Sequence, residues 1–343
     1  MMRMPKHQQG LGLVELMISI TLGLLLSAAI IQAFVATRSS YRVQEAISQI
    51  QVASRYANHF LGKDLRMAGY MGCASRGIEP NIVASNPDAD VQFDETTAVR
   101  GFDNLAQNNA FDAVAGTDAI TIRMASNISA QLTGNMTSDN ANVQVSANTL
   151  GFIKDDYIMI TDCEASDLFR ATTVSESSGK VTIAHANTNN TTNRLSKAYG
   201  PDAEILAFES VSYFIRDTGR TTSDGNPIHG LFVQRRTAAQ GGTIPDPAEL
   251  VDGVENMQLT YGEDTDGDNN VDVYRDAANV ASWGNVLSIR VELLVVSQEE
   301  NVVGQTGSAT AQRVQFAGQD VVNTDGRYRR SIVSVFAVRN RVQ

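Results

Sequence analysis

Residues 10–36 read GLGLVELMISITLGLLLSAAIIQAFVA, and this stretch decides the architecture of the 343-residue chain. Glu15 is the only charged residue within it. As a helix, residues 11–36 would extend about 39 Å, which is enough to cross a hydrocarbon core of about 30 Å with some tilt. A carboxylate inside such a span costs a few kcal/mol, so the sequence predicts a partner that offsets its charge.

The length of this apolar run differs from that of a secretory signal peptide. Such a peptide has an apolar core of about 7–15 residues and ends at a small-residue cleavage site. The run here is longer, and residues 27–36 contain no A-x-A site. A simple membrane anchor has a suitable length but gives Glu15 no role.

The residues from Gly10 to Leu16, GLGLVEL, resemble the type IV prepilin motif, in which Glu occupies the fifth mature position. The resemblance implies that a prepilin peptidase cuts between Gly10 and Leu11 and N-methylates Leu11. It also implies that Glu15 docks the subunit by meeting the cationic amino terminus of a neighbour. Leaving one of these charges unpaired in an apolar bundle costs several kcal/mol. The alternative is an incidental Glu at a membrane boundary.

The charge distribution supports a fixed orientation in the membrane. The leader, residues 1–10, contains Arg3 and Lys6 and no acid, which predicts a cytoplasmic leader and a periplasmic C-terminal head at the inner membrane. Removing the leader would change the formal net charge from −11 to −13. A chain this acidic has no general electrostatic footprint for nucleic acid, so no nucleic acid partner is expected.

Apolar residues continue beyond Ala36 at three- and four-residue steps, while polar residues fill the other face. No proline occurs between Pro5 and Pro80. The sequence therefore predicts one helix from Leu13 to Met67, about 80 Å long. Within the N-terminal helical region, residues 11–70, we expect residues 11–36 to be transmembrane and the remainder to form an amphipathic spine. Gly69 and Gly72 stand where a helix cap is expected.

Residues 71–343 are expected to form a β-rich head. The segments with a strand-like pattern are 118–124, 141–146, 151–162, 168–174, 180–184, 203–216, 228–236, 256–262, 286–297 and 328–339. Turn residues between 216 and 228 predict a hairpin. A long helix followed by antiparallel strands is the α+β pattern. With the prepilin motif, it predicts a type IV pilin-like fold with an enlarged antiparallel head.

The two cysteines, Cys73 and Cys163, both fall in the predicted periplasmic head. An oxidising periplasm permits a disulfide between them. Closing a loop of about 90 residues would stabilise the head by roughly 4 to 5 kcal/mol in the chain-entropy model. Two free buried thiols are the alternative.

A second chemical signal is the acidic stretch EDTDGDNNVD, residues 263–272. Its oxygen-bearing side chains alternate, a spacing that wraps hard ligands around calcium; they are Asp264, Asp266, Asp268, Asn270 and Asp272. The match to an EF-hand loop is partial, because Arg275 stands at the twelfth position and the flanks resemble strands. We expect a Ca²⁺-stabilised connection, and a solvated acidic turn is the alternative.

Motifs of common enzymes are missing from the sequence. There is no G-x-S-x-G, no H-E-x-x-H and no Walker loop, and the four histidines are scattered. We therefore expect a protein that is not an enzyme.

Later segments narrow the resemblance to the PilW-type minor pilins of type IV pili. They are LVDGVENMQLTYG at 250–262 with the acidic stretch behind it, GYMGC at 69–73, residues 286–297, and Arg329-Arg330-Ser331. The resemblance implies a low-abundance subunit that primes or caps the filament, in twitching motility and adhesion. The partners it implies are other minor pilins, the major pilin and a tip adhesin, with movement from the inner membrane to the pilus tip.

Two other functions fit the same sequence. A minor pseudopilin of a type II secretion system shares the motif and the long helix. A calcium-binding envelope protein held by an uncleaved anchor would share the apolar span and the acidic stretch.

Overall fold

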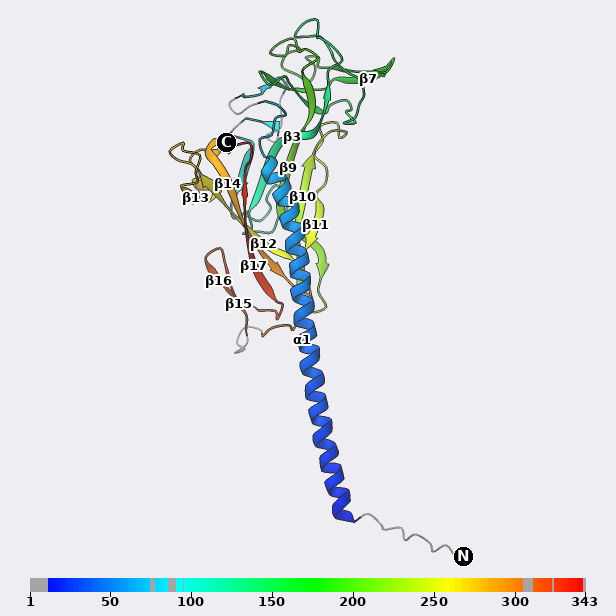
Figure 1. Ribbon diagram of the computed structural model, residues 1–343, viewed down its shortest axis with the longest axis vertical. Helices are drawn as coiled ribbons and strands as arrows, with labels where there is room; N and C mark the ends of the chain where they lie inside the picture. Colours follow the sequence, from blue (N-terminus) through cyan, green and yellow to red (C-terminus); the bar gives the residue numbers. More distant parts are fainter. Residues whose placement is uncertain are drawn as a thin grey trace, which may run out of the picture.

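The computed structural model describes residues 12–74, 78–85, 91–94, 96–304, 311–322 and 324–341. Its longest element is helix α1 (Leu13–Met67), which has the bounds predicted from the sequence. Figure 1 shows the first half of α1 projecting away from the head and the second half running along the strands. The helix ends before Gly69, whose positive φ of 75° lets its N–H reach the carbonyl oxygen of Arg123 at 2.9 Å.

The largest sheet of the head is built around the long strand β9 (Glu204–Thr221). Strand β9 pairs antiparallel with β3, β5 and β10, and β1 adds a short parallel pair to β6. The other strands of this sheet are β1 (Asn81–Ile82), β2 (Val99–Phe102), β3 (Ala119–Gln131), β5 (Tyr157–Thr161), β6 (Ser166–Arg170), β10 (Pro227–Arg236) and β11 (Ala248–Asp252).

A second antiparallel sheet has the strand order β13-β12-β14-β17. Its strands are β12 (Val254–Glu263), β13 (Val273–Arg275), β14 (Val286–Val296) and β17 (Arg329–Ala337), with the 3₁₀ turns η2 (Ala277–Asn279) and η3 (Trp283–Asn285) between β13 and β14. Two small sheets complete the head. They contain β4 (Val143–Val145), β7 (Thr173–Ser177) and β8 (Lys180–Ala184), and the hairpin β15 (Arg313–Phe316) and β16 (Gln319–Val322).

The long helix on a strand-rich head confirms the predicted pilin-like α+β fold, and the β9–β10 hairpin lies where it was predicted. Two predicted strands are wrong in extent. The segment 168–174 divides into the end of β6 and the start of β7, because Thr172 N–H bonds the Ala184 carbonyl instead of continuing the strand. The segment 151–162 is extended only over β5, because Gly151 and Asp155 have positive φ.

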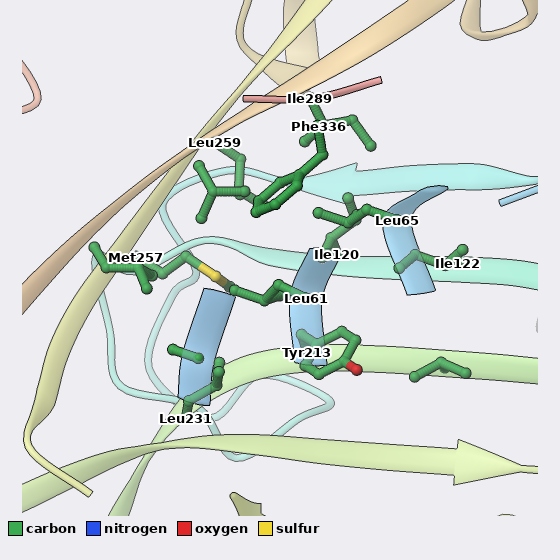
Figure 2. Packing of buried hydrophobic residues seen from close by; sticks show 14 of the residues in the cluster. Leu61, Leu65, Ile120, Ile122, Tyr213, Leu231, Met257, Leu259, Ile289 and Phe336 are labelled. Atoms are coloured by element: carbon green, nitrogen blue, oxygen red, sulfur yellow. The ribbon is translucent and has the colours of Figure 1, made fainter. Parts of the chain in front are cut away.

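The second half of α1 packs against both large sheets, and Figure 2 shows this core. Leu61 and Leu65 of the helix meet Ile120 and Tyr213 of the first sheet and Phe336 of the second within one cluster. Small residues make the close approach possible, since a Cβ on Gly62 would lie 2.6 Å from the Phe336 ring.

A polar contact within this apolar core ties α1 to the first sheet. The carboxylate of Asp64, which is 2% exposed, accepts a hydrogen bond from the Tyr213 hydroxyl at 2.6 Å. It also forms an ion pair with Arg235, which contacts Glu209 at 2.8 Å. Burial and the nearby Asp64 charge raise the pKa of Tyr213, so its hydroxyl stays a donor at neutral pH. The contacts of Asp64 with Tyr213 and Arg235 fix the position of α1 along the first sheet.

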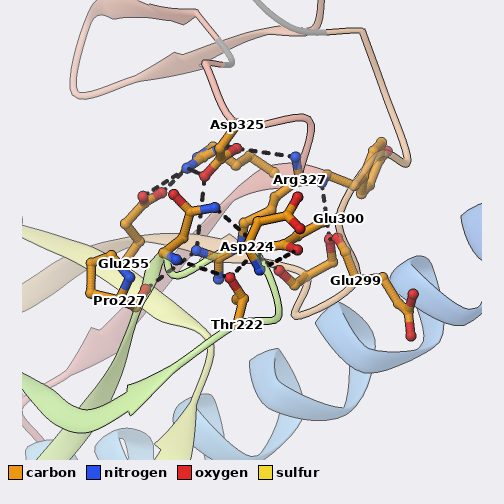
Figure 3. Close-up of polar contacts among 12 residues, drawn as sticks. Thr222, Asp224, Pro227, Glu255, Glu299, Glu300, Asp325 and Arg327 are labelled. Carbon is orange, nitrogen blue, oxygen red and sulfur yellow. Dashed lines mark hydrogen bonds and ion pairs between the residues drawn. The ribbon is translucent and has the colours of Figure 1, made fainter.

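A polar cluster secures the end of the head nearest the free half of α1 (Figure 3). Glu300 accepts hydrogen bonds from Ser223 Oγ at 2.8 Å and the Asp224 N–H at 3.0 Å, at the turn between β9 and β10. Arg329 forms a bidentate contact with Glu255 at 2.7 and 2.8 Å. The Glu300 contacts join the segment after β14 to the β9–β10 turn of the first sheet, and the Arg329 contact joins β17 to β12 within the second sheet.

Replacing Asp64 tests the role of this contact in stability. Asp64→Ala should lower the free energy of unfolding by about 3 kcal/mol, because it leaves Arg235 without this buried partner and the Tyr213 hydroxyl with only the Phe60 carbonyl at 3.3 Å. Denaturant unfolding of the full chain in detergent measures the change. Asp112→Ala is the control, since its ion pair with Arg216 is exposed and should contribute less than about 1 kcal/mol. Equal losses for the two variants would contradict the prediction.

Candidate functional site

The first half of α1 is the largest apolar surface of the described chain. All residues from Gly12 to Tyr41 are exposed, and the large apolar side chains between Leu13 and Val35 are 52–75% exposed. The helix is long and apolar enough to cross a membrane. A soluble monomer does not expose a continuous apolar surface of this size, so this segment fits a membrane or other subunits.

Glu15 is the only charged side chain on α1 before Arg38. Its Oε2 accepts a hydrogen bond from the Gly12 N–H at 3.0 Å, so the carboxylate lies at the positive end of the helix dipole. Among the described residues, no cation lies within ion-pair distance of Glu15. The N-terminus of the helix therefore stabilises part of the negative charge of Glu15. The carboxylate can still accept a cationic partner.

The hydroxyl groups of the apolar span are satisfied within the helix itself. Ser19, Thr21, Ser27 and Thr37 each donate to the carbonyl four residues earlier, at 2.8 to 3.0 Å. Such bonds remove the cost of placing hydroxyls in a medium without water. Glu15 is consequently the one side chain of the span with a full charge to neutralise. The predicted processing residues Gly10 and Leu11 lie outside the described residues and stay a prediction.

The structure contains a disulfide between Cys73 and Cys163, with Cα atoms 4.9 Å apart. Cys73 follows the end of α1, and Cys163 lies in the turn between β5 and β6. The Cys73 N–H also bonds Glu204 Oε1 at 3.2 Å, at the start of β9. The exit of the helix is thus held to the first sheet by a covalent bond and a hydrogen bond.

The acidic loop after β12 brings three of its predicted ligands together. One carboxylate oxygen from each of Asp264, Asp266 and Asp268 lies within 4.8 Å of the others. Asp272 is not in this group, because its Oδ2 accepts the N–H and hydroxyl of Thr265, both at 2.7 Å. The Asn270 side-chain amide donates to Asp268 Oδ2 at 3.0 Å.

The donor chemistry of these three carboxylates fits calcium. Both Asp264 oxygens already accept backbone N–H groups, from Gly267 at 2.6 Å and Asn269 at 2.9 Å, which leaves each oxygen a second lone pair. The nearby Arg275 is engaged with Glu263 at 3.1 Å. Three hard oxygens and no soft ligand suit Ca²⁺, with water or carbonyl oxygens completing the coordination.

A second acidic hollow was not predicted from the sequence. Asp103, Asp118, Asp276 and Glu292 line a cavity of about 460 Å³ beside β12 and β14. Asp118 is buried and accepts the N–H groups of Asn104 at 2.8 Å and Leu259 at 2.7 Å. Nothing near Asp118 in the sequence indicates its burial, because the partners that enclose it include a residue 141 positions away.

Two family models match separate parts of the chain. Residues 212–340 match the model of type IV pilus-assembly protein W, and residues 5–31 match the prokaryotic N-terminal methylation motif. No curated protein and no solved structure matches the chain.

The methylation motif, the apolar helix and the strand-rich head are together consistent with a type IV pilin-like α+β fold. The matched region from β9 to the C-terminal strand then supports a PilW-type pilin, related to type IV pilus assembly. These two matches imply interaction with other pilins, fit a membrane-anchored subunit and point to a structural, non-enzymatic protein.

Asp118 in the acidic hollow predicts that the free energy of unfolding depends on pH. Burial raises the pKa of Asp118 to about 6, and the charges of Asp103 and Asp276 add to the rise despite two backbone hydrogen bonds. The unfolded chain keeps a pKa near 4. As the pH falls from 7 to 5, the folded state therefore binds a proton that the unfolded state does not bind. This group should stabilise the protein by about 1 kcal/mol over that interval.

Comparing the wild type with Asp118→Asn isolates this contribution, because the asparagine cannot titrate. The difference in the free energy of unfolding between the two proteins should shift by about 1 kcal/mol in favour of the wild type at pH 5. Denaturant unfolding at both pH values measures it. A difference that stays constant between pH 5 and pH 7 would contradict the prediction.

Proposed function

We propose that this chain is a minor pilin that primes or caps type IV pilus assembly together with other minor pilins. The observation that carries the proposal is the exposed apolar half of α1, which has a single carboxylate near its beginning. This segment provides a docking helix for the filament. The head is much larger than a repeating subunit needs, and a bulky head is most easily placed at the filament end.

The proposed docking step is the pairing of Glu15 with the amino terminus of an adjacent subunit. Cleavage after Gly10 makes Leu11 the cationic end of each mature chain. In a bundle of parallel helices, the fifth mature residue of one subunit lies near the first residue of the next. An unpaired carboxylate in this apolar setting is costly, so the pair selects one axial register between neighbours.

The proposal gives the chain a defined route. A prepilin peptidase removes the leader at the inner membrane, with the head in the periplasm, and the subunit then joins the major pilin and a tip adhesin at the pilus tip. The resulting fibre would serve twitching motility and adhesion. Mass spectrometry of the mature protein should find a methylated Leu11, and an intact Met1 would favour an uncleaved anchor.

Deleting the gene distinguishes the pilus from its closest alternative, a minor pseudopilin of a type II secretion system. Loss of pili and of twitching, with secretion intact, supports the proposal. Secretion substrates retained in the periplasm, with normal pili, would support the pseudopilin.

Replacing Glu15 tests the docking step. Glu15→Ala and Glu15→Gln should weaken association with other pilins about a hundredfold, since an unpaired charge costs about 3 kcal/mol or more. Co-purification from the inner membrane and counts of pili per cell measure the effect. Gln32→Ala is the control, because it changes an exposed polar residue of the same helix without removing a charge. Normal pili in the Glu15 variants would contradict the docking step.

We also propose that the loop after β12 binds Ca²⁺ through Asp264, Asp266 and Asp268. The proximity of the three carboxylates supports this site, and the ion would offset their mutual repulsion. Calcium would rigidify the connection between β12 and β13.

Calcium should therefore raise the stability of the full chain. Ca²⁺ at 100 times its dissociation constant would add about 2.7 kcal/mol to the free energy of unfolding. Thermal unfolding in Ca²⁺, in Mg²⁺ and in chelator measures the shift. The variant Asp266→Asn/Asp268→Asn should lose it, while Asp246→Asn, an exposed position in another loop, should keep it. The same unfolding temperature in Ca²⁺ and chelator would contradict the site.

A further inference from the structure

An exposed face of α1 carries a second surface, which borders the head at β11. Its residues recur at helical spacing and form what we call the outer stripe: Arg38, Tyr41, Val52, Arg55, Tyr56 and Lys63. The apolar members are strongly exposed, with Tyr41 at 67%, Val52 at 51% and Tyr56 at 57%. Tyrosine and arginine are enriched at protein interfaces, and lysine is not.

The bases of the outer stripe lack acidic partners. Arg38, Arg55 and Lys63 form no ion pair with any residue that the structure describes. Helix α1 holds five basic and three acidic residues, whereas the whole chain holds 27 and 38. Of the acids of α1 beyond Glu15, Asp64 is buried against Arg235, so Glu45 is the one acid of this helix beside the stripe. Helix α1 therefore carries an excess of basic residues, whereas the rest of the chain carries an excess of acidic residues.

A membrane does not account for the whole stripe. Arg38 lies directly after the apolar span, within reach of lipid headgroups. Arg55 and Lys63 lie 19 and 27 residues beyond Ala36, which places them about 29 and 40 Å further along an upright helix. Both distances exceed the Debye length of about 8 Å at physiological ionic strength. A protein surface is therefore the partner that can contact the entire stripe.

A hollow beside the stripe adds an apolar element to this surface. Val52 and Tyr56 line a groove of about 690 Å³ between α1 and the edge strand β11. Its other apolar walls come from Leu250, Val251 and Val296. Its acids from the head, Glu249 and Asp252, are already engaged by Arg220, and Glu45 of α1 is its third acid. The groove can therefore take an apolar side chain from a partner whose carboxylates meet the bases of the stripe.

We propose that the outer stripe docks a neighbouring pilin-type subunit that presents carboxylates opposite Arg55 and Lys63. This inference rests on the proposed function, because it assumes that the chain joins a complex of pilins. The stripe continues from the apolar half of α1, so the subunit that packs along that half also meets the stripe. Exposed charges of this kind select the partner and accelerate association more than they add affinity.

Cross-linking in the full chain tests the inference. Tyr56 is replaced by photoreactive benzoylphenylalanine in cells that assemble the complex, and the product is identified by mass spectrometry. We expect a covalent product with another pilin-type subunit. Arg55→Glu/Lys63→Glu should reduce its yield at least tenfold, while Arg55→Lys/Lys63→Arg should preserve it. Lys180→Glu is the matched control, since Lys180 is exposed on β8 in a different part of the head.

A yield unchanged by the charge reversal would overturn the inference, as would a product only with lipid or with a second copy of this chain. Thermal unfolding of the reversed variant checks that it folds. In the purified complex that carries the Tyr56 cross-linker without the charge reversal, raising salt from 0.15 to about 0.5 M should lower the yield, because the charges are exposed. Normal pili after gene deletion would instead overturn the proposed function, so the two failures are distinguishable.

Discussion

The head depends on a helix face narrow enough for two sheets to pack against it. Ala46, Ala53 and Ala57 are buried on α1 between larger residues, and Gly62 lies against the Phe336 ring. Small side chains bring the backbone of α1 close to both sheets, and the leucines fill the remaining space. One helix therefore contacts both sheets, and the disulfide and Asp64 then fix where the first sheet meets it.

The same helix has to satisfy two different surroundings. Up to Tyr41 its side chains are exposed on every face and almost all are uncharged, whereas from Ala46 onward one face is buried and the other polar. The change occurs without a proline or a break in the helical hydrogen bonds. A rigid connection of this type transmits the orientation of the head to whatever surrounds the apolar half.

Features set by local sequence were predictable, and features set by distant contacts were not. The bounds of α1 follow from an uninterrupted apolar period and the absence of proline. The hairpin β9–β10 follows from its turn residues. In contrast, β11, β13, β15 and β16 contain only three to five residues each, which is too short for an alternating pattern to identify them, although each pairs with a strand that is close in the sequence. The sequence likewise indicated Glu15 and the cysteines, whereas Asp118 is enclosed by partners distant in the sequence, among them the Leu259 N–H that donates to its carboxylate.

The two proposed contacts of α1, at Glu15 and at the outer stripe, together determine the orientation of the subunit more fully than either contact does alone. Glu15 and Arg55 are separated by 40 residues, which corresponds to about 60 Å along α1. The proposed pairing at Glu15 fixes the axial position of the subunit but leaves its rotation about the helix axis open. The proposed contact at the outer stripe fixes that rotation, because the stripe occupies one face. A partner that satisfied both would hold the large head in a single orientation, as a defined filament end requires.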